Sequence, residues 1–401
     1  MKSPRHVLIL ECALSGHHSV YLERIASGFL DNGDEVTVTT LRRDLGSTCI
    51  DRLRTKYGKQ VSIFVIEDAE YDAAFGTWMG EAGRELALRQ LFGRVYRHVY
   101  DLRLVDYVFL PYVDYCLHAL GALGSPFGKT EWGGICMRPS FHYAHFDVIA
   151  PAPKLARIKQ SLLLRLLRVR SLQMLFTIDE LLEQYVAQRN SSLASRIRYV
   201  PDPAELVGSH TRASARQHLG IPFNARVILC YGAIDERKGL DVLVNALNLP
   251  GAPSDISLLV VGKQSQWAKC LLSSSTSKSL IEQCRLHVVD AFVDDELQQA
   301  VFVASDAVWL GYKAHYSMSG VLVLSTLARK PVIATREGLI GWHTRKNRLG
   351  VVIDVSCIET VIEALKTLSS GRLNEPGLPQ EWDRYWSWAG MIERLMRKRP
   401  C

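Results

Sequence analysis

Short apolar runs alternate with amphipathic stretches along this chain, and the alternating series begins afresh near the middle. The first series opens with an apolar run at residues 6–10, followed by a glycine-bearing loop, an amphipathic stretch that ends at Gly33 and a second apolar run at 34–40. The second series starts at residues 225–234 and repeats this order. Strands that alternate with helices build a parallel sheet covered by helices. The sequence therefore predicts two tandem Rossmann-like α/β domains.

The other apolar runs complete both series, and a polar, proline-bearing stretch near Pro203 separates them. Further strands of the first series are expected at residues 61–67, 107–113, 134–142, 171–179 and 196–203, with a helix at 80–103. In the second series strands are expected at 256–263, 285–293, 306–312 and 330–335, with helices at 238–249 and 321–328. The predicted domains are residues 1–203 and 204–380, followed by an aromatic helix over 381–401.

Composition excludes several classes of protein. Hydrophobic residues make up 48% of the 401 residues and charged residues 22%, which is the balance of a folded globular protein. No apolar run approaches the roughly 18 residues of a membrane-spanning helix. The run at residues 7–10 is too short for a signal peptide and is followed by Glu11, so it is interpreted as a buried strand. Nine cysteines without a CxxC pair argue against zinc ribbons and disulfide scaffolds, and favour reduced thiols in the cytoplasm.

The formal net charge of +7 permits an anionic partner, and the absence of a nucleic-acid-binding signature argues against nucleic acid. Residues 153–174 form the most basic amphipathic segment, in which arginines and lysines interleave with leucines. Such a helix can lie on the inner face of an anionic membrane as a peripheral contact. The alternative is an ordinary domain helix whose leucines face the sheet while its arginines face water.

Four stretches together resemble a glycosyltransferase of GT-B fold, most similar to the large retaining group called glycosyltransferase family 4. They are residues 15–38, 199–207 with 219–222, 229–247 and 315–342. The first resembles the glycine loop, helix and strand that open the family's fold. The third is close to its donor-side signature around a Lys-Gly pair, and the fourth matches its Glu-rich donor region in outline.

The resemblance implies a GT-B architecture in which two Rossmann-like domains face a central cleft. The N-terminal domain, residues 1–203, would bind the acceptor, and residues 204–380 would bind the donor. The helix at 381–401 would cross back to the N-terminal domain. The implied activity is transfer of a sugar, with retention, from a nucleotide sugar to a glycan or lipid-linked acceptor in bacterial surface polysaccharide or glycoconjugate synthesis. No metal and no cofactor beyond the nucleotide sugar are implied.

Arg237 and Lys238 precede a predicted helix and match the basic residues with which the family binds the donor phosphates. Breaking the glycosidic bond leaves a diphosphate whose charge must be neutralised, which fixed cations and helix N-terminal amides can do. Gly232, near the start of this stretch, is a further predicted donor-binding residue. Many relatives carry an arginine at the next position, where this chain has Ala233.

The main departure from the family lies in the fourth stretch, where two glutamates eight positions apart are expected. Alignment on Gly320 places Ser317 and Ser325 at those positions. A hydroxyl can hydrogen-bond but supplies no charge, so the donor contacts would be weaker or different. Ser317, Ser319 and Gly320 form a turn into a predicted helix, which suits either phosphate binding or plain helix capping.

Three explanations of the serine pair stay open: an unusual donor, a substitute residue such as Glu337, or lost transferase activity. Gly338 to Gly341 are predicted to form a loop after the strand at 330–335. Since ligands bind at the carboxyl ends of parallel strands, Glu337 and Gly338 are candidate donor-binding residues.

On the N-terminal side, Gly16, His17 and His18 lie in the first strand-to-helix loop and are candidate acceptor-binding residues. Glycine lets a backbone approach a ligand closely. Arg138, at a predicted strand end, is a further candidate that can pair with a carboxylate or with an acceptor phosphate. The alternative for both histidines is plain surface polarity.

His142 lies at the end of the strand expected at 134–142 and matches the histidine that many relatives place near the donor sugar, so it is a candidate catalytic residue with Arg237 and Lys238. Glu131 precedes that strand and is a candidate base for an inverting enzyme. Two alternatives to a transferase stay open: a catalytically silent GT-B subunit that binds a partner or glycan, and a nucleotide-sugar epimerase of the same fold.

Overall fold

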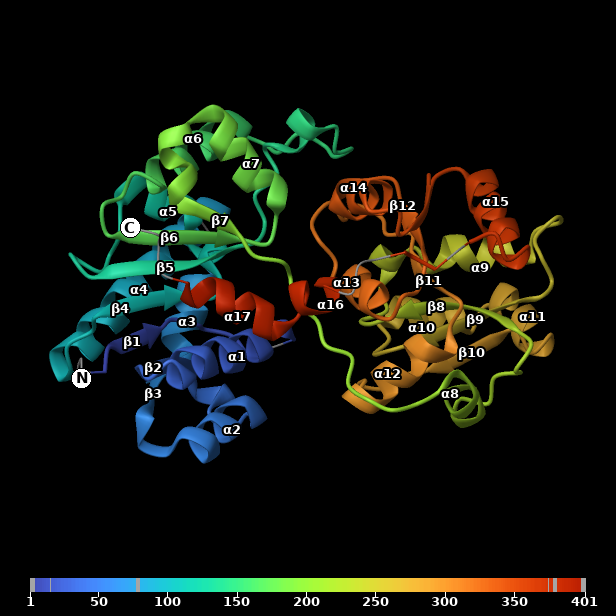
Figure 1. Ribbon diagram of the computed structural model, residues 1–401, viewed down its shortest axis with the longest axis horizontal. Coiled ribbons are helices and arrows are strands. Elements are labelled where there is room, and N and C mark those ends of the chain that lie inside the picture. Colours follow the sequence, from blue (N-terminus) through green and yellow to red (C-terminus); the bar gives the residue numbers. More distant parts are fainter. Residues whose placement is uncertain (1–3, 15, 77–79, 374, 378–380, 398–401) are drawn as a thin grey trace. The chain divides into compact units, whose positions relative to one another are not determined.

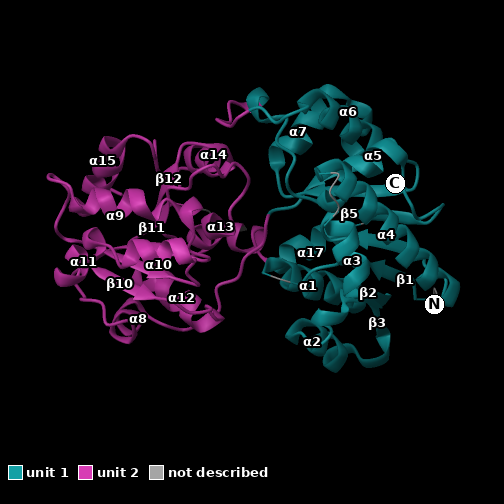
Figure 2. Ribbon diagram, turned by 180° about the vertical axis from the view of Figure 1, so that it is seen from behind, with its two compact units in different colours: residues 1–145, 152–201, 388–401 teal, residues 146–151, 202–387 magenta. Residues whose placement is uncertain are grey.

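The computed structural model describes residues 4–14, 16–76, 80–373, 375–377 and 381–397 (Figure 1). The chain forms two compact units, coloured separately in Figure 2. Unit 1 comprises Met1–His145, Ala152–Pro201 and Trp388–Cys401, and unit 2 comprises Phe146–Pro151 and Asp202–Ser387.

Unit 1 is built on a parallel sheet with the strand order β3-β2-β1-β4-β5-β6-β7. Its described strands are β1 (His6–Ile9), β2 (Glu35–Leu41), β3 (Val61–Ile66), β4 (Tyr107–Leu110), β5 (Glu131–Cys136), β6 (Leu172–Thr177) and β7 (Ile197–Tyr199). Every residue of β1 and β4 is buried, as expected for central strands covered on both faces. The order reverses between β1 and β4, and such a reversal opens a ligand crevice at the carboxyl ends of the strands.

The helices that flank this sheet include α17, from the end of the chain. Unit 1 contains α1 (His17–Asp31), α2 (Thr48–Tyr57), α3 (Asp68–Phe75), α4 (Gly80–Leu102), α5 (Leu117–Leu123), α6 (Ala156–Leu166), α7 (Glu180–Arg189) and α17 (Trp388–Met396). Figure 1 shows α17 lying along α1, where Tyr21 and Trp388 pack edge to face with ring centroids 4.9 Å apart. A Cβ at Gly28 would lie 2.6 Å from Ile392, so the glycine permits this close approach. The last four residues of the predicted segment 381–401 lie outside the described residues.

Unit 2 repeats the same plan, with the order β10-β9-β8-β11-β12-β13 and a reversal between β8 and β11. Its described strands are β8 (Arg226–Tyr231), β9 (Ile256–Val261), β10 (Leu286–Val289), β11 (Ala307–Leu310), β12 (Val332–Thr335) and β13 (Gly350–Ile353). Its helices are α8 (Arg212–His218), α9 (Leu240–Asn248), α10 (Gln266–Leu272), α11 (Ser275–Glu282), α12 (Asp295–Ala304), α13 (Gly320–Leu327), α14 (Gly338–Lys346), α15 (Ile358–Ser369) and α16 (Glu381–Tyr385). The two parallel sheets are those that the alternating pattern predicts.

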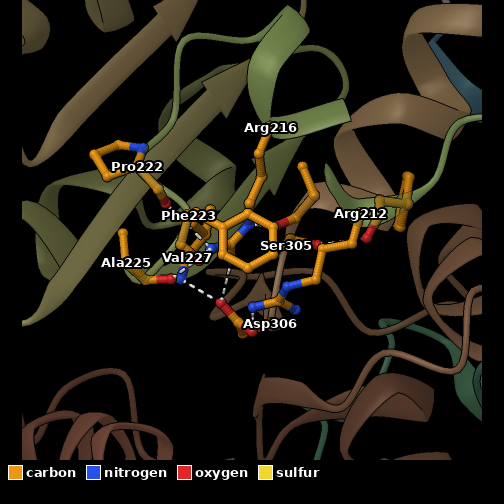
Figure 3. A network of polar contacts seen from close by, with 10 residues as sticks. Arg212, Arg216, Pro222, Phe223, Ala225, Val227, Ser305 and Asp306 are labelled. Carbon is orange, nitrogen blue, oxygen red and sulfur yellow. Dashed lines mark hydrogen bonds and ion pairs between the residues drawn. The ribbon is translucent and has the colours of Figure 1, made fainter. Parts of the chain in front are cut away.

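A buried arginine of α8 binds the sheet of unit 2 through hydrogen bonds and an ion pair. Figure 3 shows the guanidinium groups of Arg212 and Arg216 directed at Asp306, the residue before β11. Arg216 is 1% exposed, and its Nη2 donates to Asp306 Oδ2 at 2.8 Å. Its Nε donates to the carbonyl of Ala304 at 3.0 Å, and Asp306 accepts the backbone N–H of Val227 at 2.7 Å. The carboxylate thus joins α8, β8 and the start of β11.

One expected strand has the wrong bounds. The strand expected at 134–142 begins at Glu131 and ends at Cys136, so His142 lies in the connection that follows.

The basic segment 153–174 contains α6, whose Leu163 and Leu166 are buried while Arg165 is exposed. This is the arrangement of an ordinary domain helix. None of the helices that the structure describes has the length and apolarity needed to traverse a bilayer.

Candidate active site

The first cluster of polar side chains lies in unit 2, where β8 and β11 end side by side. Lys238 is only 3% exposed. Its Nζ donates to the carbonyl of Tyr231 at 2.8 Å and to the hydroxyl of Tyr312 at 2.5 Å. An ammonium carries three donors, and the third has no partner among the residues that the structure describes. One donor of a nearly buried cation is therefore free for an anion.

The backbone around Lys238 leaves little freedom for that side chain. The indole Nε1 of Trp309 on β11 donates to the Lys238 carbonyl at 2.9 Å. Gly239 adopts φ +63°, and a Cβ there would collide with the carbonyl of Gly311. Gly232 adopts φ +100°, and a Cβ there would lie 3.4 Å from Lys238 Nζ. The two glycines permit the close approach that holds the ammonium between the strand ends.

The ring of Tyr312 also lies beside Arg237, the second predicted cation. The guanidinium carbon of Arg237 lies 5.3 Å from the centre of the Tyr312 ring, and Nη2 lies 3.7 Å from Asp235 Oδ2. The Arg237 side chain is 38% exposed, so it can reach a ligand. Tyr312 is absent from the sequence prediction. The signal for it is a tyrosine two residues beyond a buried strand next to the reversal of strand order.

The serines predicted to replace the glutamates differ in accessibility. Ser325 is fully buried, and its hydroxyl donates to the carbonyl of Val321 within α13 at 2.7 Å. Ser317 Oγ lies 3.5 Å from His315 Nε2. Ser319 is the N-cap residue of α13, but its hydroxyl makes no capping bond. Open space surrounds the Cβ position of Gly320. Ser317, Ser319 and Gly320 therefore suit a ligand better than Ser325 does.

His315 brings a further polar group to this cluster. Burial lowers the pKa of His315. The hydrogen bond that its Nε2 donates to the Met318 carbonyl opposes this shift, and the charges of Arg237 and Lys238 add to it. The neutral imidazole adds a hydrogen-bonding group without adding charge. Sequence reasoning missed this residue because a lone histidine in a connection carries no signal of its own.

The predicted loop at 338–341 is wrong, because Gly338 begins α14. Gly338 has φ +62°, and a Cβ there would lie 2.5 Å from the Cα of Tyr316. Its N–H donates to the carbonyl of Ile149, which belongs to the short segment of unit 2 at 146–151. The glycine permits this packing, so a helix follows the strand directly. Glu337 is the half-buried N-cap residue of α14, and its side chain makes no capping bond.

The second cluster lies in unit 1, where β1 and β4 end. Glu11 is fully buried, and its Oε1 accepts the backbone N–H groups of Cys12 at 2.8 Å and Ala13 at 3.2 Å. Its Oε2 lies 3.2 Å from His18 Nδ1. Gly16, with φ +60°, is the N-cap residue of α1, so both predicted histidines lie in its first turn rather than in a loop. In the sequence, Glu11 serves only as evidence against a signal peptide, because it directly follows the first apolar run.

Aromatic rings enclose His18. Its ring stacks on His17 with centroids 4.4 Å apart and on Tyr115 at 5.9 Å, and it meets Tyr112 edge to face at 4.9 Å. The Arg138 guanidinium carbon lies 5.1 Å from the Tyr112 ring centre. Desolvation, with the nearby His18 and Arg138, lowers the pKa of His17 to about 4. The imidazole of His18 thus contacts Glu11, His17, Tyr112 and Tyr115, and Arg138 lies beside Tyr112.

His142 and Glu131 are not part of this cluster. His142 is fully buried, and its Nε2 lies 2.8 Å from Asp179 Oδ2, while its buried Nδ1 has no partner. Asp179 also caps α7 through the N–H of Leu181. His142 therefore helps to hold Asp179 at the N-terminus of α7. Contact of His142 with a sugar stays a prediction. Glu131 begins β5 and so lies at the amino edge of the sheet, opposite to the edge where a base is needed.

The described residues contain no group of three histidine, cysteine or acidic side chains placed to hold a metal. That the activity needs no metal stays a prediction. The cluster in unit 2 combines two cations with hydroxyls and helix starts, which suits a phosphate-bearing ligand. The cluster in unit 1 combines a buried carboxylate with an imidazole, which suits proton transfer.

We compared the sequence and the structure of this chain with known proteins. No family model matches the chain. A D-inositol 3-phosphate glycosyltransferase of Acidothermus cellulolyticus is 29% identical over 218 residues, which are 50% of this chain and 44% of the relative. The chain thus matches less than half the length of this curated relative.

Solved structures match almost the whole chain at low identity. Anabaena Alr3699/HepE, solved with UDP and glucose, has a TM-score of 0.64 at 13% identity over 98% of each chain. Sucrose-phosphate synthase of Thermosynechococcus elongatus has a TM-score of 0.64 at 14% identity over 98% of this chain and 97% of its own. A putative UDP-N-acetylglucosamine 2-epimerase of Listeria monocytogenes reaches 0.56 at 12% over 98% and 95%. These likenesses confirm the GT-B fold.

Proposed function

We propose that this protein is a glycosyltransferase that moves a sugar from a nucleotide sugar to a glycan or lipid-linked acceptor. The observation that carries the proposal is the nearly buried Lys238 at the strand reversal of unit 2, with one ammonium donor free and Arg237 beside it. Ligands bind at this point of parallel sheets. Both cations are the residues that the resemblance assigns to the donor phosphates.

The proposed chemistry needs a preorganised positive site. As the bond from the sugar to the diphosphate breaks, negative charge grows on the leaving oxygens. Lys238 and Arg237 lie where they would stabilise that charge without rearranging, and α9 begins directly after them. Ser317, Ser319 and Gly320 would contact the sugar or phosphate, together with Gly232, Glu337 and Gly338. With Ser325 bonded within its own helix, we infer that the donor contacts differ from those of glutamate-bearing relatives.

The donor is proposed from the neighbours' ligands. Anabaena Alr3699/HepE was solved with UDP and with UDP-glucose, so a uridine nucleotide sugar is the first donor to test. Retention, bacterial surface polysaccharide synthesis and a cytoplasmic location stay predictions. So does peripheral membrane contact, for which the exposed Leu155 and Ile158 beside the cations of α6 are the favourable feature.

An epimerase is the second candidate, because epimerases share the fold at TM-scores of 0.56 and 0.54. A silent subunit is the third, because Ser325 is engaged within α13. An epimerase would interconvert two nucleotide sugars without releasing the nucleotide. A transferase would release it, and a silent subunit would do neither.

Calorimetry with UDP, GDP, ADP and their glucose conjugates tests the proposal. We expect one nucleotide to bind the wild type, and Lys238→Ala to weaken it at least tenfold, or by about 1.4 kcal/mol. Lys366→Ala removes an exposed lysine of α15 and should bind as the wild type does. Thermal unfolding without nucleotide shows whether Lys238→Ala remains folded. No binding by wild type, or equal binding by folded Lys238→Ala, would contradict the proposal.

A further inference from the structure

The start of α6 in unit 1 carries exposed apolar and cationic side chains that belong to neither cluster of the candidate site. We infer that this turn docks on a membrane: Leu155 and Ile158 insert among the headgroups of an anionic bilayer, and Lys154 and Arg157 bind the lipid phosphates. The inference deepens the proposed function and rests on it only for one consequence, that the acceptor is lipid-linked. It differs from the flat amphipathic helix of the sequence prediction, because only one end of α6 makes the contact.

The charge of this part of the chain has one sign. Residues 148–178 contain six lysines and arginines and no acidic residue, so their formal charge is +6, against +7 for the whole chain. Lys154, Arg157 and Arg165 are exposed, and they form no ion pair with any residue that the structure describes. A leaflet that contains anionic lipids would supply the missing counter-charges.

The stability of α6 does not account for cations at its start. The N-terminus of a helix carries partial positive charge, so acidic side chains stabilise the first turn and basic ones destabilise it. The first turn of α6 contains Arg157 and no acidic residue, and Lys154 lies just before it. Leu155, the N-cap residue, adopts φ +57°, which is unfavourable for a residue with a side chain. The composition of this turn therefore points to a partner outside the fold.

The apolar surface of α6 that is open to a bilayer is confined to its start. Leu155 is 67% exposed and Ile158 is 54% exposed. Farther along the helix, Leu163, Leu166 and Leu167 are buried in the core of unit 1. Figures 1 and 2 both show α6 at the periphery of this unit. The helix can therefore dock by its end, whereas docking along its length would require its leucines to leave the core.

The topology places this end of α6 at the edge of the sheet where the acceptor cluster lies. The chain leaves β5 at the carboxyl edge and enters β6 at the amino edge, so α6 begins toward the carboxyl edge. An ion pair agrees with this direction, because Lys159 Nζ lies 3.4 Å from Oε2 of Glu81, in the first turn of α4. Glu11 and His18 lie at the same edge. A bilayer held here would present lipid headgroups on the acceptor side of unit 1.

Vesicle sedimentation of the full chain tests the docking site. We expect the wild type to bind vesicles of equimolar phosphatidylcholine and phosphatidylglycerol, and to bind vesicles of phosphatidylcholine alone at least tenfold more weakly, or by about 1.4 kcal/mol. Molar salt should release most of the bound protein, because it shortens the Debye length to about 3 Å. Both results are typical of a surface that combines apolar insertion with charge attraction.

Paired substitutions separate the two contributions. Leu155→Gln with Ile158→Gln should weaken binding to the anionic vesicles by about tenfold or more, because two apolar side chains no longer leave water. Lys154→Gln with Arg157→Gln should weaken it by about tenfold or more as well, since each cation near an anionic surface contributes about a factor of five.

Matched controls lie on α4 and in the connection that follows it, on another surface of unit 1. Leu102 is 75% exposed and Leu104 is 60% exposed, so Leu102→Gln with Leu104→Gln removes two similarly exposed apolar side chains. Arg94→Gln with Arg97→Gln removes two exposed cations and lowers the net charge by the same amount as the cationic pair at α6. Both controls should bind vesicles as the wild type does. All eight side chains are exposed, so each variant should melt as the wild type does and keep its UDP affinity without vesicles.

Three outcomes would overturn the inference. No binding of the wild type to the anionic vesicles would leave an acidic protein as the alternative partner for these cations. Equal binding to both kinds of vesicle would remove the part assigned to charge. Equal losses in the α6 variants and in the α4 controls would show that the contact is not at α6. A wild type that docks on vesicles but binds no nucleotide would instead reject the proposed function and support the docking site.

Discussion

The two units share one strand order around their central strands, yet the residues at the two reversals differ in chemistry. Where β1 and β4 end, unit 1 has the carboxylate of Glu11 bonded to His18. Where β8 and β11 end, unit 2 has the cations Lys238 and Arg237. The topology decides where a site can form, and the few residues after each strand decide what the site can do.

A tyrosine occupies the equivalent position in both units. Tyr112 stands two residues beyond β4 and Tyr312 two residues beyond β11. Each ring also has an arginine nearby, Arg138 at 5.1 Å and Arg237 at 5.3 Å from the ring centre. In unit 2 the hydroxyl accepts from a lysine, whereas in unit 1 the ring lies edge to face with His18. A tyrosine therefore contacts a lysine ammonium in one unit and an imidazole in the other.

The largest expected effect tests whether the units behave separately. Arg216→Met would leave Asp306, whose side chain is only 9% exposed, without its fully buried partner, which costs about 3–5 kcal/mol. Because the proposed donor site lies in unit 2, we expect UDP to shift the calorimetric transition of unit 2 to higher temperature. We expect Arg216→Met to lower that transition alone. Arg212→Met, at a 41% exposed partner of the same carboxylate, should cost below about 1 kcal/mol. A common shift of all transitions would break the comparison.

An intermediate effect is expected from the two tyrosines. Tyr312→Phe removes a hydrogen bond to the Lys238 ammonium, and bonds to charged groups are worth about 1.5–3 kcal/mol. We therefore expect UDP affinity to fall by about tenfold or more in calorimetry. Tyr112→Phe keeps the ring beside His18 and should leave UDP affinity unchanged. Equal losses in both variants would show that the tyrosines do not have separate functions.

The sequence predicts the fold because each buried strand appears in it as a short, local run of apolar residues. It also predicted Arg237 and Lys238 as donor-site residues, since both lie in one short motif. It missed the bond from Lys238 to Tyr312 and the pairing of Glu11 with His18 amid aromatic rings. Residues from different parts of the chain meet there because β8 lies beside β11 and β1 beside β4, and strand adjacency is not a local property.

The start of α14 shows a second limit of local patterns. Two glycines within four residues, Gly338 and Gly341, are typical of a loop. In the structure a Cβ at either position would collide with backbone, from Tyr316 at the first and from Arg336 at the second. Glycine therefore permits close packing at the beginning of a helix. A pattern that considers only the chain itself cannot separate these two uses of glycine.

The smallest expected effect concerns the proton balance of the cluster in unit 1. Desolvation, with the nearby His18 and Arg138, lowers the pKa of His17 to about 4 in the folded protein, from about 6.5 in the unfolded chain. The unfolded chain therefore binds a proton between these values that the folded protein does not, so stability falls as the pH falls from 6.5 towards 4. His17→Gln removes this contribution, and its melting temperature should fall less than that of wild type between pH 7 and pH 5. His98→Gln, at an exposed histidine of α4, is the control. Identical pH dependence in His17→Gln and wild type would mean that His17 is as free to take up a proton as any surface histidine, and the contrast with the cationic cluster of unit 2 would then be weaker.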